Sequence, residues 1–237
     1  MVTLRGIYAP IATPFQNGEI AYDKLKENMN VWLGTNLSGF VVMGSNGEFV
    51  ALSLEERRKL ILAVSESTMG EDKPVIAGTG CQSTQETIRL TQYAAEAGAA
   101  AALVLSPNYY KNAMTEELTK NFYWEVAEAS SIPLILYNMP ANSGINLTAE
   151  LVVELSKHPN IIGVKDSSGN IVQIAQIING TSSDFAVFAG SASFLYASLM
   201  LGAQGGILAL ANVLPNECAQ LQELVDAGKY AEAKALQ

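Results

Sequence analysis

Continuous apolar runs alternate with helix-type patterns along the whole chain. The apolar runs do not switch between apolar and polar at every residue, which is typical of strands buried on both faces of a parallel sheet. We expect strands at residues 6–14, 39–44, 74–80, 101–107, 133–140, 161–167, 185–191 and 205–210.

Helical patterns follow these strands, for example at residues 53–69, 84–97, 115–129 and 148–157. Ser53 and Glu56 form the pattern of a capping box, in which each side chain satisfies a backbone N–H of the other residue. Thr115 and Thr148 stand at equivalent helix starts.

Eight β-then-α units at spacings of roughly 20–35 residues predict an α/β protein of the (β/α)₈ TIM barrel type, which typically takes about 250 residues. An open doubly wound sheet is the competing architecture. It normally needs fewer strands, and its glycine-rich phosphate fingerprint is missing after the first strand. No linker or low-complexity segment divides the chain.

Composition narrows the classes of partner and compartment. The 237 residues are 49% hydrophobic, and the net charge is 14 − 23 = −9, which argues against nucleic acid or an anionic membrane surface as a partner. An anionic substrate would therefore need local hydrogen-bond donors. Two distant cysteines, no signal-peptide pattern and no apolar run of transmembrane length predict a reducing, cytoplasmic location.

Lys165 is the most informative residue, because it stands where an apolar strand should end. Chemistry in a barrel gathers at the C-terminal ends of the strands. Burial lowers the pKa of an ammonium group, and the neutral amine is a nucleophile toward carbonyl carbon. The alternative is an ordinary lysine that reaches solvent or pairs with Asp166.

Other strand ends offer groups that could serve such a lysine. Tyr137, on the adjacent strand, is either a core aromatic or a proton carrier, and Tyr109 leaves the same choice open. The turn at residues 44–48 contains Ser45 and Asn46 between glycines. It is either a tight connection or a cradle whose N–H groups and side chains hold a carboxylate.

The chain has a single histidine, which limits the catalytic mechanisms and metal sites that it can form. His158 precedes strand six at the opposite end of the predicted barrel, where we expect a loop residue. This argues against Ser-His-Asp catalysis and against a histidine-based metal site. We interpret Cys81 as a packed thiol and Cys218 as a core residue.

Three segments together resemble the dihydrodipicolinate synthase/N-acetylneuraminate lyase superfamily, the pyruvate-type class I aldolases built on (β/α)₈ barrels. They are Gly44-Ser45-Asn46-Gly47-Glu48, Tyr137-Asn138-Met139-Pro140 and Gly163-Val164-Lys165-Asp166-Ser167, and the resemblance runs from Gly6 to the C-terminus.

The resemblance implies a role for each matching residue. Lys165 would form the Schiff base with a 2-oxo acid, and Tyr137 would shuttle protons. Ser45 would supply the hydroxyl of the proton relay, and Tyr109 would be inserted into that relay by a neighbouring subunit. The remaining roles are to bind substrate: Ser45 and Asn46 at the carboxylate, the Ile207 carbonyl near the lysine, and Ser167 and Gly190 on the far side of the pocket.

The resemblance also implies partners. They are a small 2-oxo acid and an aldehyde, in a homo-oligomer that is a dimer or a tetramer. No metal or organic cofactor is expected, because the lysine imine itself stabilises the carbanion.

Asn142 bears on the identity of the aldehyde. Dihydrodipicolinate synthases carry an arginine at the matching position, where it grips a carboxylate, and asparagine cannot form a bidentate ion pair. Residues 44–49, 78–85, 140–144 and 209–214 give a closer resemblance to 4-hydroxy-2-oxoglutarate aldolases, which release pyruvate and glyoxylate. The alternatives are 4-hydroxy-tetrahydrodipicolinate synthase, N-acetylneuraminate or another sugar-acid lyase, and a non-catalytic barrel that binds a keto acid.

The end of the chain also departs from the family pattern. We expect residues 1–228 to form the catalytic barrel and residues 229–237 to begin a C-terminal helical extension that is largely missing. Such a shortening would be expected to weaken contacts between subunits.

Overall fold

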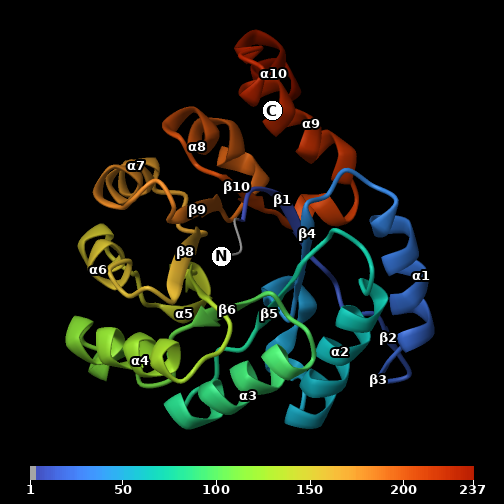
Figure 1. Ribbon diagram of the computed structural model, residues 1–237, viewed down its shortest axis with the longest axis vertical. Helices are drawn as coiled ribbons and strands as arrows, with labels where there is room; N and C mark the ends of the chain where they lie inside the picture. The colour runs from blue at the N-terminus through green and yellow to red at the C-terminus, as the bar shows by residue number, and fades with distance from the viewer. Residues whose placement is uncertain (1–3) are drawn as a thin grey trace.

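Eight parallel strands close into a barrel, in the order β1-β10-β9-β8-β7-β6-β5-β4 with β4 pairing back to β1 (Figure 1). This is a computed structural model that describes residues 4–237. The barrel strands are β1 (Gly6–Pro10), β4 (Gly39–Val42), β5 (Val75–Gly78), β6 (Ala101–Leu105), β7 (Leu134–Asn138), β8 (Ile161–Asp166), β9 (Ala186–Ala189) and β10 (Gly205–Ile207). The predicted (β/α)₈ fold is confirmed.

Helices form a ring outside the strands (Figure 1). They are α1 (Tyr22–Leu33), α2 (Leu54–Ser67), α3 (Thr84–Glu96), α4 (Glu116–Glu128), α5 (Pro140–Ser143), α6 (Ala149–Leu155), α7 (Ile171–Gly180), α8 (Leu195–Leu201), α9 (Pro215–Asp226) and α10 (Tyr230–Leu236). The Ser53–Glu56 capping box is present, and Thr115 and Thr148 cap α4 and α6.

The first strand is shorter than expected. It ends at Pro10, and a small hairpin of β2 (Phe15–Gln16) and β3 (Glu19–Ile20) follows before α1. Asn17 and Gly18 both have positive φ, of 55° and 85°, which is the requirement of a tight type I′ hairpin turn. The prediction of one continuous strand over residues 6–14 was therefore wrong at its C-terminal end.

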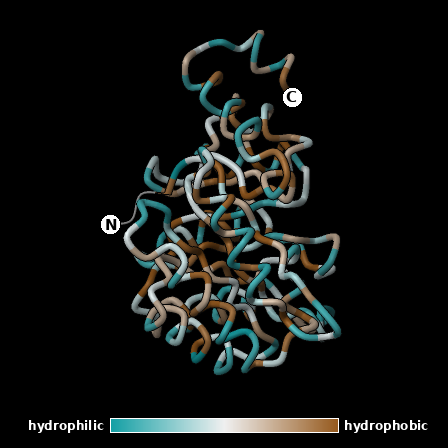
Figure 2. Tube along the Cα trace, turned by 90° about the vertical axis from the view of Figure 1, so that its right-hand side faces the viewer, coloured by the Kyte–Doolittle hydropathy of each residue, from teal (hydrophilic) through white to brown (hydrophobic). Residues whose placement is uncertain are grey.

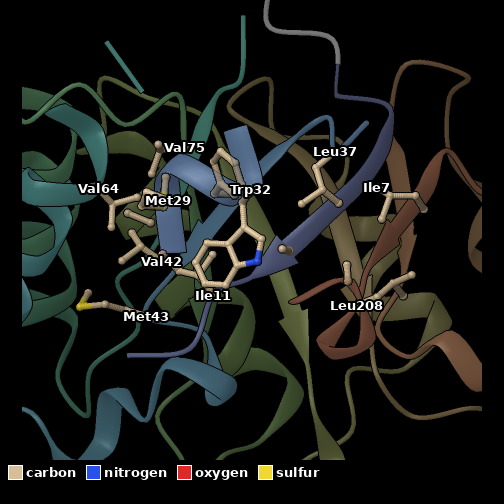
Figure 3. Close-up of a cluster of buried hydrophobic side chains, with 14 of the residues drawn as sticks. Ile7, Ile11, Met29, Trp32, Leu37, Val42, Met43, Val64, Val75 and Leu208 are labelled. Atoms are coloured by element: carbon tan, nitrogen blue, oxygen red, sulfur yellow. The ribbon is translucent and has the colours of Figure 1, made fainter. Parts of the chain in front are cut away.

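Two apolar layers hold the barrel together. Inside it, Tyr8 and Phe188 pack edge to face with ring centres 5.7 Å apart, in a cluster that reaches up to Tyr137. Outside it, helix side chains such as Met29 and Trp32 of α1 pack on the outward faces of the strands (Figure 3). Figure 2 shows the hydrophobic residues concentrated inside the molecule. The carboxyl ends of the strands are therefore held on a rigid frame.

The C-terminal helices lie beside the barrel, and α10 stands farthest from it (Figures 1 and 2). The Gln237 side chain accepts a hydrogen bond from the Tyr196 N–H at 2.8 Å and donates one to the Ala192 carbonyl at 2.8 Å. The division into a barrel over residues 1–228 and the start of an extension over residues 229–237 stays a prediction. Across residues 4–237, no helix has both the length and the apolar character needed to cross a bilayer.

His158 lies in the turn that precedes β8, at the N-terminal side of the barrel as expected. Its ring is buried against Trp124, with ring centres 4.9 Å apart, and its Nδ1 accepts a hydrogen bond from the Asn160 N–H. Cys218 is buried on α9, as the core interpretation required. His158 therefore lies at the opposite end of the barrel from the strand end that carries Lys165.

Candidate active site

Lys165 points into the barrel near the carboxyl end of β8. Its Cα register partners are Tyr137 and Phe188, whose side chains belong to the interior cluster, and partners across a parallel ladder face the same way. Lys165 is only 2% exposed, and no carboxylate within residues 4–237 forms an ion pair with it. It therefore neither reaches solvent freely nor pairs with Asp166.

Burial lowers the pKa of the Lys165 ammonium group from its ordinary value, and its interaction with Tyr137 acts in the opposite direction. The Lys165 Nζ lies 4.4 Å from the centre of the Tyr137 ring. Burial has the larger effect because an ammonium group loses its hydration inside the barrel. The environment thus favours the neutral amine, which is the nucleophilic form.

Tyr137 and Ser45 meet above the lysine. The Tyr137 hydroxyl lies 3.0 Å from Ser45 Oγ, and either oxygen can be the donor. Tyr137 is itself buried, with 4% of its surface exposed. Hydroxyls within hydrogen-bond reach can pass a proton between them. The structure thus brings together Lys165, Tyr137 and Ser45.

Ser45 begins a short 3₁₀ turn (Ser45–Gly47) directly after β4, and Asn46 lies exposed in the same turn. The first N–H groups of a helical turn have no partner inside it and are available to an anion. Met43 and Glu48, on either side, have positive φ of 60° and 55°, an unfavourable conformation for residues with side chains. Thr13 Oγ1 donates to the Gly47 carbonyl at 2.7 Å and holds the turn in place. The turn can accommodate a carboxylate.

Ser167 and Gly190 lie together on the other side of Lys165. The Gly190 N–H donates to the Asp166 carbonyl at 2.7 Å, and the Ser167 N–H donates to the Asn138 carbonyl at 2.8 Å. A Cβ at position 190 would stand 2.0 Å from Ser167 Oγ, so only glycine leaves room for that hydroxyl. Ile207 is fully buried, and its side chain packs in the interior cluster. The expectation that the Ile207 backbone carbonyl lies near the Lys165 amine stays a prediction.

A cavity of about 210 Å³ opens at the barrel mouth beside Ser45. Asn142, which the sequence placed near the substrate, lines it from α5. Gln82 and Asn108 also line this cavity, and the sequence reasoning did not single them out. Gln82 Oε1 accepts the N–H groups of Asn108 and Tyr109 at 3.0 Å each, which joins the loops after β5 and β6. The sequence could have indicated Gln82 as a site residue, because it lies shortly after the strand predicted at residues 74–80.

Cys81 lines the same cavity but is poorly suited to act as a nucleophile. Burial raises the pKa of its thiol, and nearby Arg57 opposes this only in part. The Arg57 Nη1 lies 3.8 Å from Cys81 Sγ. Because the thiolate is the reactive form, a raised pKa fits the interpretation of Cys81 as a packed thiol.

Tyr109 is not brought to Ser45 and Tyr137 within one chain. It is 78% exposed and packs edge to face against Tyr110, with ring centres 5.0 Å apart. It lines a second, outer hollow instead of the cavity at Ser45. The role implied for it requires a second copy of the chain and stays a prediction.

Comparison with known proteins agrees with this geometry. Residues 3–237 match the model of the dihydrodipicolinate synthetase family. A mitochondrial protein of Emericella nidulans, described as a probable 4-hydroxy-2-oxoglutarate aldolase, is 37% identical over 98% of this chain and 77% of its own length. A 4-hydroxy-tetrahydrodipicolinate synthase of Methanothrix thermoacetophila is 38% identical over 98% of this chain and 78% of its own.

Solved structures show the same fold. The 4-hydroxy-tetrahydrodipicolinate synthase of Methylacidiphilum fumariolicum SolV superposes with a TM-score of 0.94 at 29% identity, over 98% of this chain and 77% of its own. A prophage protein of the dihydrodipicolinic acid synthase family from E. coli K12, solved in complex with pyruvate, also gives 0.94, at 30% identity over 99% of this chain and 80% of its own.

Proposed function

We propose that this chain, which belongs to the dihydrodipicolinate synthetase family, cleaves and forms a carbon–carbon bond through an imine between Lys165 and a 2-oxo acid. Its relatives are named as aldolases and synthases, so the chain is an enzyme of the pyruvate-type class I aldolase family. The observation that carries the proposal is a lysine buried inside the barrel mouth with a lowered pKa, beside the linked hydroxyls of Tyr137 and Ser45.

Imine formation begins when the neutral Lys165 amine attacks the C2 carbonyl carbon of the 2-oxo acid. The oxygen takes a proton and becomes the hydroxyl of a carbinolamine. Tyr137 then donates its proton to that hydroxyl, which leaves as water, and a protonated imine remains. Ser45 can replace the proton on Tyr137, because the two oxygens are within hydrogen-bond distance.

Cleavage uses the protonated imine as an electron sink. The C4 hydroxyl loses its proton to the Tyr137–Ser45 pair, the C3–C4 bond breaks, and its electrons move into the imine to give an enamine. The aldehyde leaves. The enamine then takes a proton at C3, and water adds to the imine to release pyruvate and the free amine. Reversal of these steps gives aldol addition, and no metal or organic cofactor is required by this route.

The substrate carboxylate is proposed to bind at the turn after β4. The chain carries a net charge of −9, so the overall field repels an anion and local donors must hold it. The N–H groups of the turn, with the Ser45 and Asn46 side chains, are suited to that task. Ser167 and Gly190 would line the opposite side of the bound keto acid.

For the substrate itself we propose 4-hydroxy-2-oxoglutarate, which would yield pyruvate and glyoxylate. The support is the 37% identity to the Emericella protein, together with Asn142, which lines the cavity and cannot offer aspartate semialdehyde the bidentate ion pair that an arginine would form. The second candidate is 4-hydroxy-tetrahydrodipicolinate synthase activity, which the 38% identity to the Methanothrix enzyme favours. A homo-oligomer in which Tyr109 of one copy reaches the site of another belongs to the same proposal.

An aldehyde-release assay tests the choice of substrate. Purified chain is given 4-hydroxy-2-oxoglutarate, N-acetylneuraminate or 2-keto-3-deoxygluconate in turn, and a separate reaction supplies pyruvate with aspartate semialdehyde. We expect cleavage of 4-hydroxy-2-oxoglutarate that is abolished in Lys165→Ala. Turnover of aspartate semialdehyde alone would establish the synthase instead, and release only from the sugar acids would establish a lyase.

The same protein tests the non-catalytic alternative. Pyruvate binding by calorimetry that is identical in the original chain and in Lys165→Ala, with no turnover of any substrate, would show a keto-acid-binding barrel. We expect the substitution to abolish the covalent part of pyruvate binding.

A further inference from the structure

Asp166, the residue after Lys165, holds a buried negative charge that the chemistry above does not use. Its side chain is 0% exposed. Successive side chains of a strand point to opposite faces, so Asp166 points away from the barrel interior, into the layer between the strands and the helices. Within residues 4–237 no lysine, arginine or histidine forms an ion pair with it.

The Asp166 carboxylate is instead held by four hydrogen-bond donors. Oδ2 accepts from Asn138 Nδ2 and from Gln173 Nε2, at 2.8 Å each. Oδ1 accepts from the Ser168 N–H at 2.8 Å and from the Ser168 hydroxyl. Burial of an unpaired charge is costly unless such donors replace its hydration. A neutral side chain would avoid that cost, so the carboxylate needs a reason beyond packing.

Asn138 is the partner of Asp166 on the neighbouring strand. It is 1% exposed, and it also donates to Asn146 Oδ1 at 2.9 Å and accepts the Leu147 N–H at 2.9 Å. All of its side-chain hydrogen bonds thus go to fixed neighbours. The end of β7 is tied at once to β8 and to the loop before α6.

The two pairs occupy consecutive positions of one ladder. Tyr137 is the register partner of Lys165, and Asn138 is the register partner of Asp166. Lys165 and Tyr137 face the barrel interior and carry the groups proposed to react. Asp166 and Asn138 face outward and form a hydrogen bond between the two strands. A slip of one residue would move a strand by about 3.3 Å and turn its side chains to the other face.

The register of this ladder changes below the two pairs. Leu134 pairs with Ile161, but the next residue, Ile135, pairs with Gly163, so Ile162 is an extra residue in β8. At such a bulge, two residues of one strand stand opposite one residue of its partner. The alignment that sets Tyr137 beside Lys165 is therefore the one above the bulge, where Asn138 and Asp166 also lie.

We propose that Asp166 and Asn138 form a clamp that positions Lys165 against Tyr137 from behind the sheet. This inference rests on the proposed function of Lys165 and adds two positioning residues to it. The clamp needs one acceptor and one donor across the strands. Asp166→Asn replaces one of the two acceptor oxygens by an NH₂ group, so the donors on one side of the side chain face another donor. Asn138→Asp sets a carboxylate against a carboxylate. Each single change therefore weakens the clamp. The exchanged pair, Asn138→Asp with Asp166→Asn, restores a donor and an acceptor.

The test is the rate at which pyruvate becomes trapped on the protein by borohydride, measured against pyruvate concentration. For each single variant we expect the rate at saturating pyruvate to fall about 10²-fold, as a misplacement of about 1 Å can cause, while the half-saturating concentration changes less than about threefold. We expect the exchanged pair to recover at least about tenfold of that loss, because orientation is restored.

Val64→Ala is the matched control for stability alone. Val64 is fully buried on α2, in an apolar cluster that contains no residue of β7 or β8, and its truncation should lower the melting temperature without changing the clamp. If the single variants trap pyruvate as fast as Val64→Ala, or if the exchanged pair recovers stability without recovering the rate, the clamp is refuted.

Two further arms keep the outcomes separate. If Asp166→Asn does not fold, Asn138→Ser serves in its place, because it removes the cross-strand donor and leaves the carboxylate its other three. Failure of the original chain to trap pyruvate would contradict the imine proposal itself. Normal trapping in the original chain and in Asn138→Ser alike would contradict only the clamp.

Discussion

Tyr137→Phe tests the hydroxyl pair while leaving the core intact. The substitution removes one oxygen and keeps the ring in the interior cluster. It abolishes the 3.0 Å contact with Ser45 Oγ and the hydroxyl beside Lys165. A net hydrogen bond is worth about 0.5–1.5 kcal/mol, so we expect a loss of stability of that size. For a chain of this length, about 1 kcal/mol lowers the melting temperature by about 2–4 °C.

The effect on chemistry should be much larger than the effect on stability. A positioned acid–base group contributes about 10²–10⁴-fold to rate, so kcat should fall by that factor while KM changes little. The assay is steady-state cleavage with pyruvate detection, run beside Ser45→Ala and the double variant. If one relay uses both hydroxyls, the double variant should be no slower than about threefold below Tyr137→Phe, because the effects are not additive.

Tyr8→Phe is the matched control. Tyr8 is a buried tyrosine of β1 in the same interior cluster, and burial raises the pKa of its hydroxyl to about 12. Its substitution should alter stability while kcat stays unchanged. A Tyr137→Phe variant with kcat equal to that of Tyr8→Phe, or a double variant whose losses multiply, would refute the relay.

The remaining predictions concern the lysine, its neighbour and the cavity. Burial lowers the pKa of Lys165 in the folded state, so the unfolded state binds more protons, and stability should rise with pH between the folded and unfolded pKa values. The kcat/KM of the original chain should rise over the same range as the amine deprotonates. Lys165→Met should lose the pH trend in melting and should have no turnover at any pH. Gly190→Ala places a Cβ 2.7 Å from the Asp166 carbonyl and should cost about 1–3 kcal/mol in chemical denaturation, whereas Gly34→Ala, whose Cβ meets nothing closer than 3.5 Å, should cost less than about 1 kcal/mol. Asn142→Arg should raise kcat/KM for aspartate semialdehyde with pyruvate by at least about tenfold, since a bidentate ion pair becomes available; an unchanged ratio to 4-hydroxy-2-oxoglutarate would contradict the role given to Asn142.

The barrel could be predicted because its strands are buried on both faces and helical patterns follow them, several of which begin at a side-chain cap. The hairpin after β1 was missed, although Asn17-Gly18 is a strong hairpin signal, because each of its strands is only two residues long and forms no apolar run. Strand ends were less predictable than the strands, since the last pairing depends on neighbours distant in sequence.

The meeting of Lys165, Tyr137 and Ser45 could be predicted because the carboxyl ends of parallel barrel strands share one mouth. The hydrogen bond between Asn138 and Asp166 could not, because it depends on a register that resets at the bulge by Ile162. Gln82 was missed for a related reason: its partners are backbone N–H groups of another loop. Tyr109 shows a different limit, since its proposed place depends on a second copy of the chain.

The most direct test of the central proposal is reduction of the protein with borohydride in the presence of pyruvate, followed by mass spectrometry of its peptides. We predict one added reduced pyruvate group per chain, located on the peptide that contains Lys165 and missing from Lys165→Ala. Reduction without any added mass, or an adduct on a different lysine that persists in Lys165→Ala, would contradict the account.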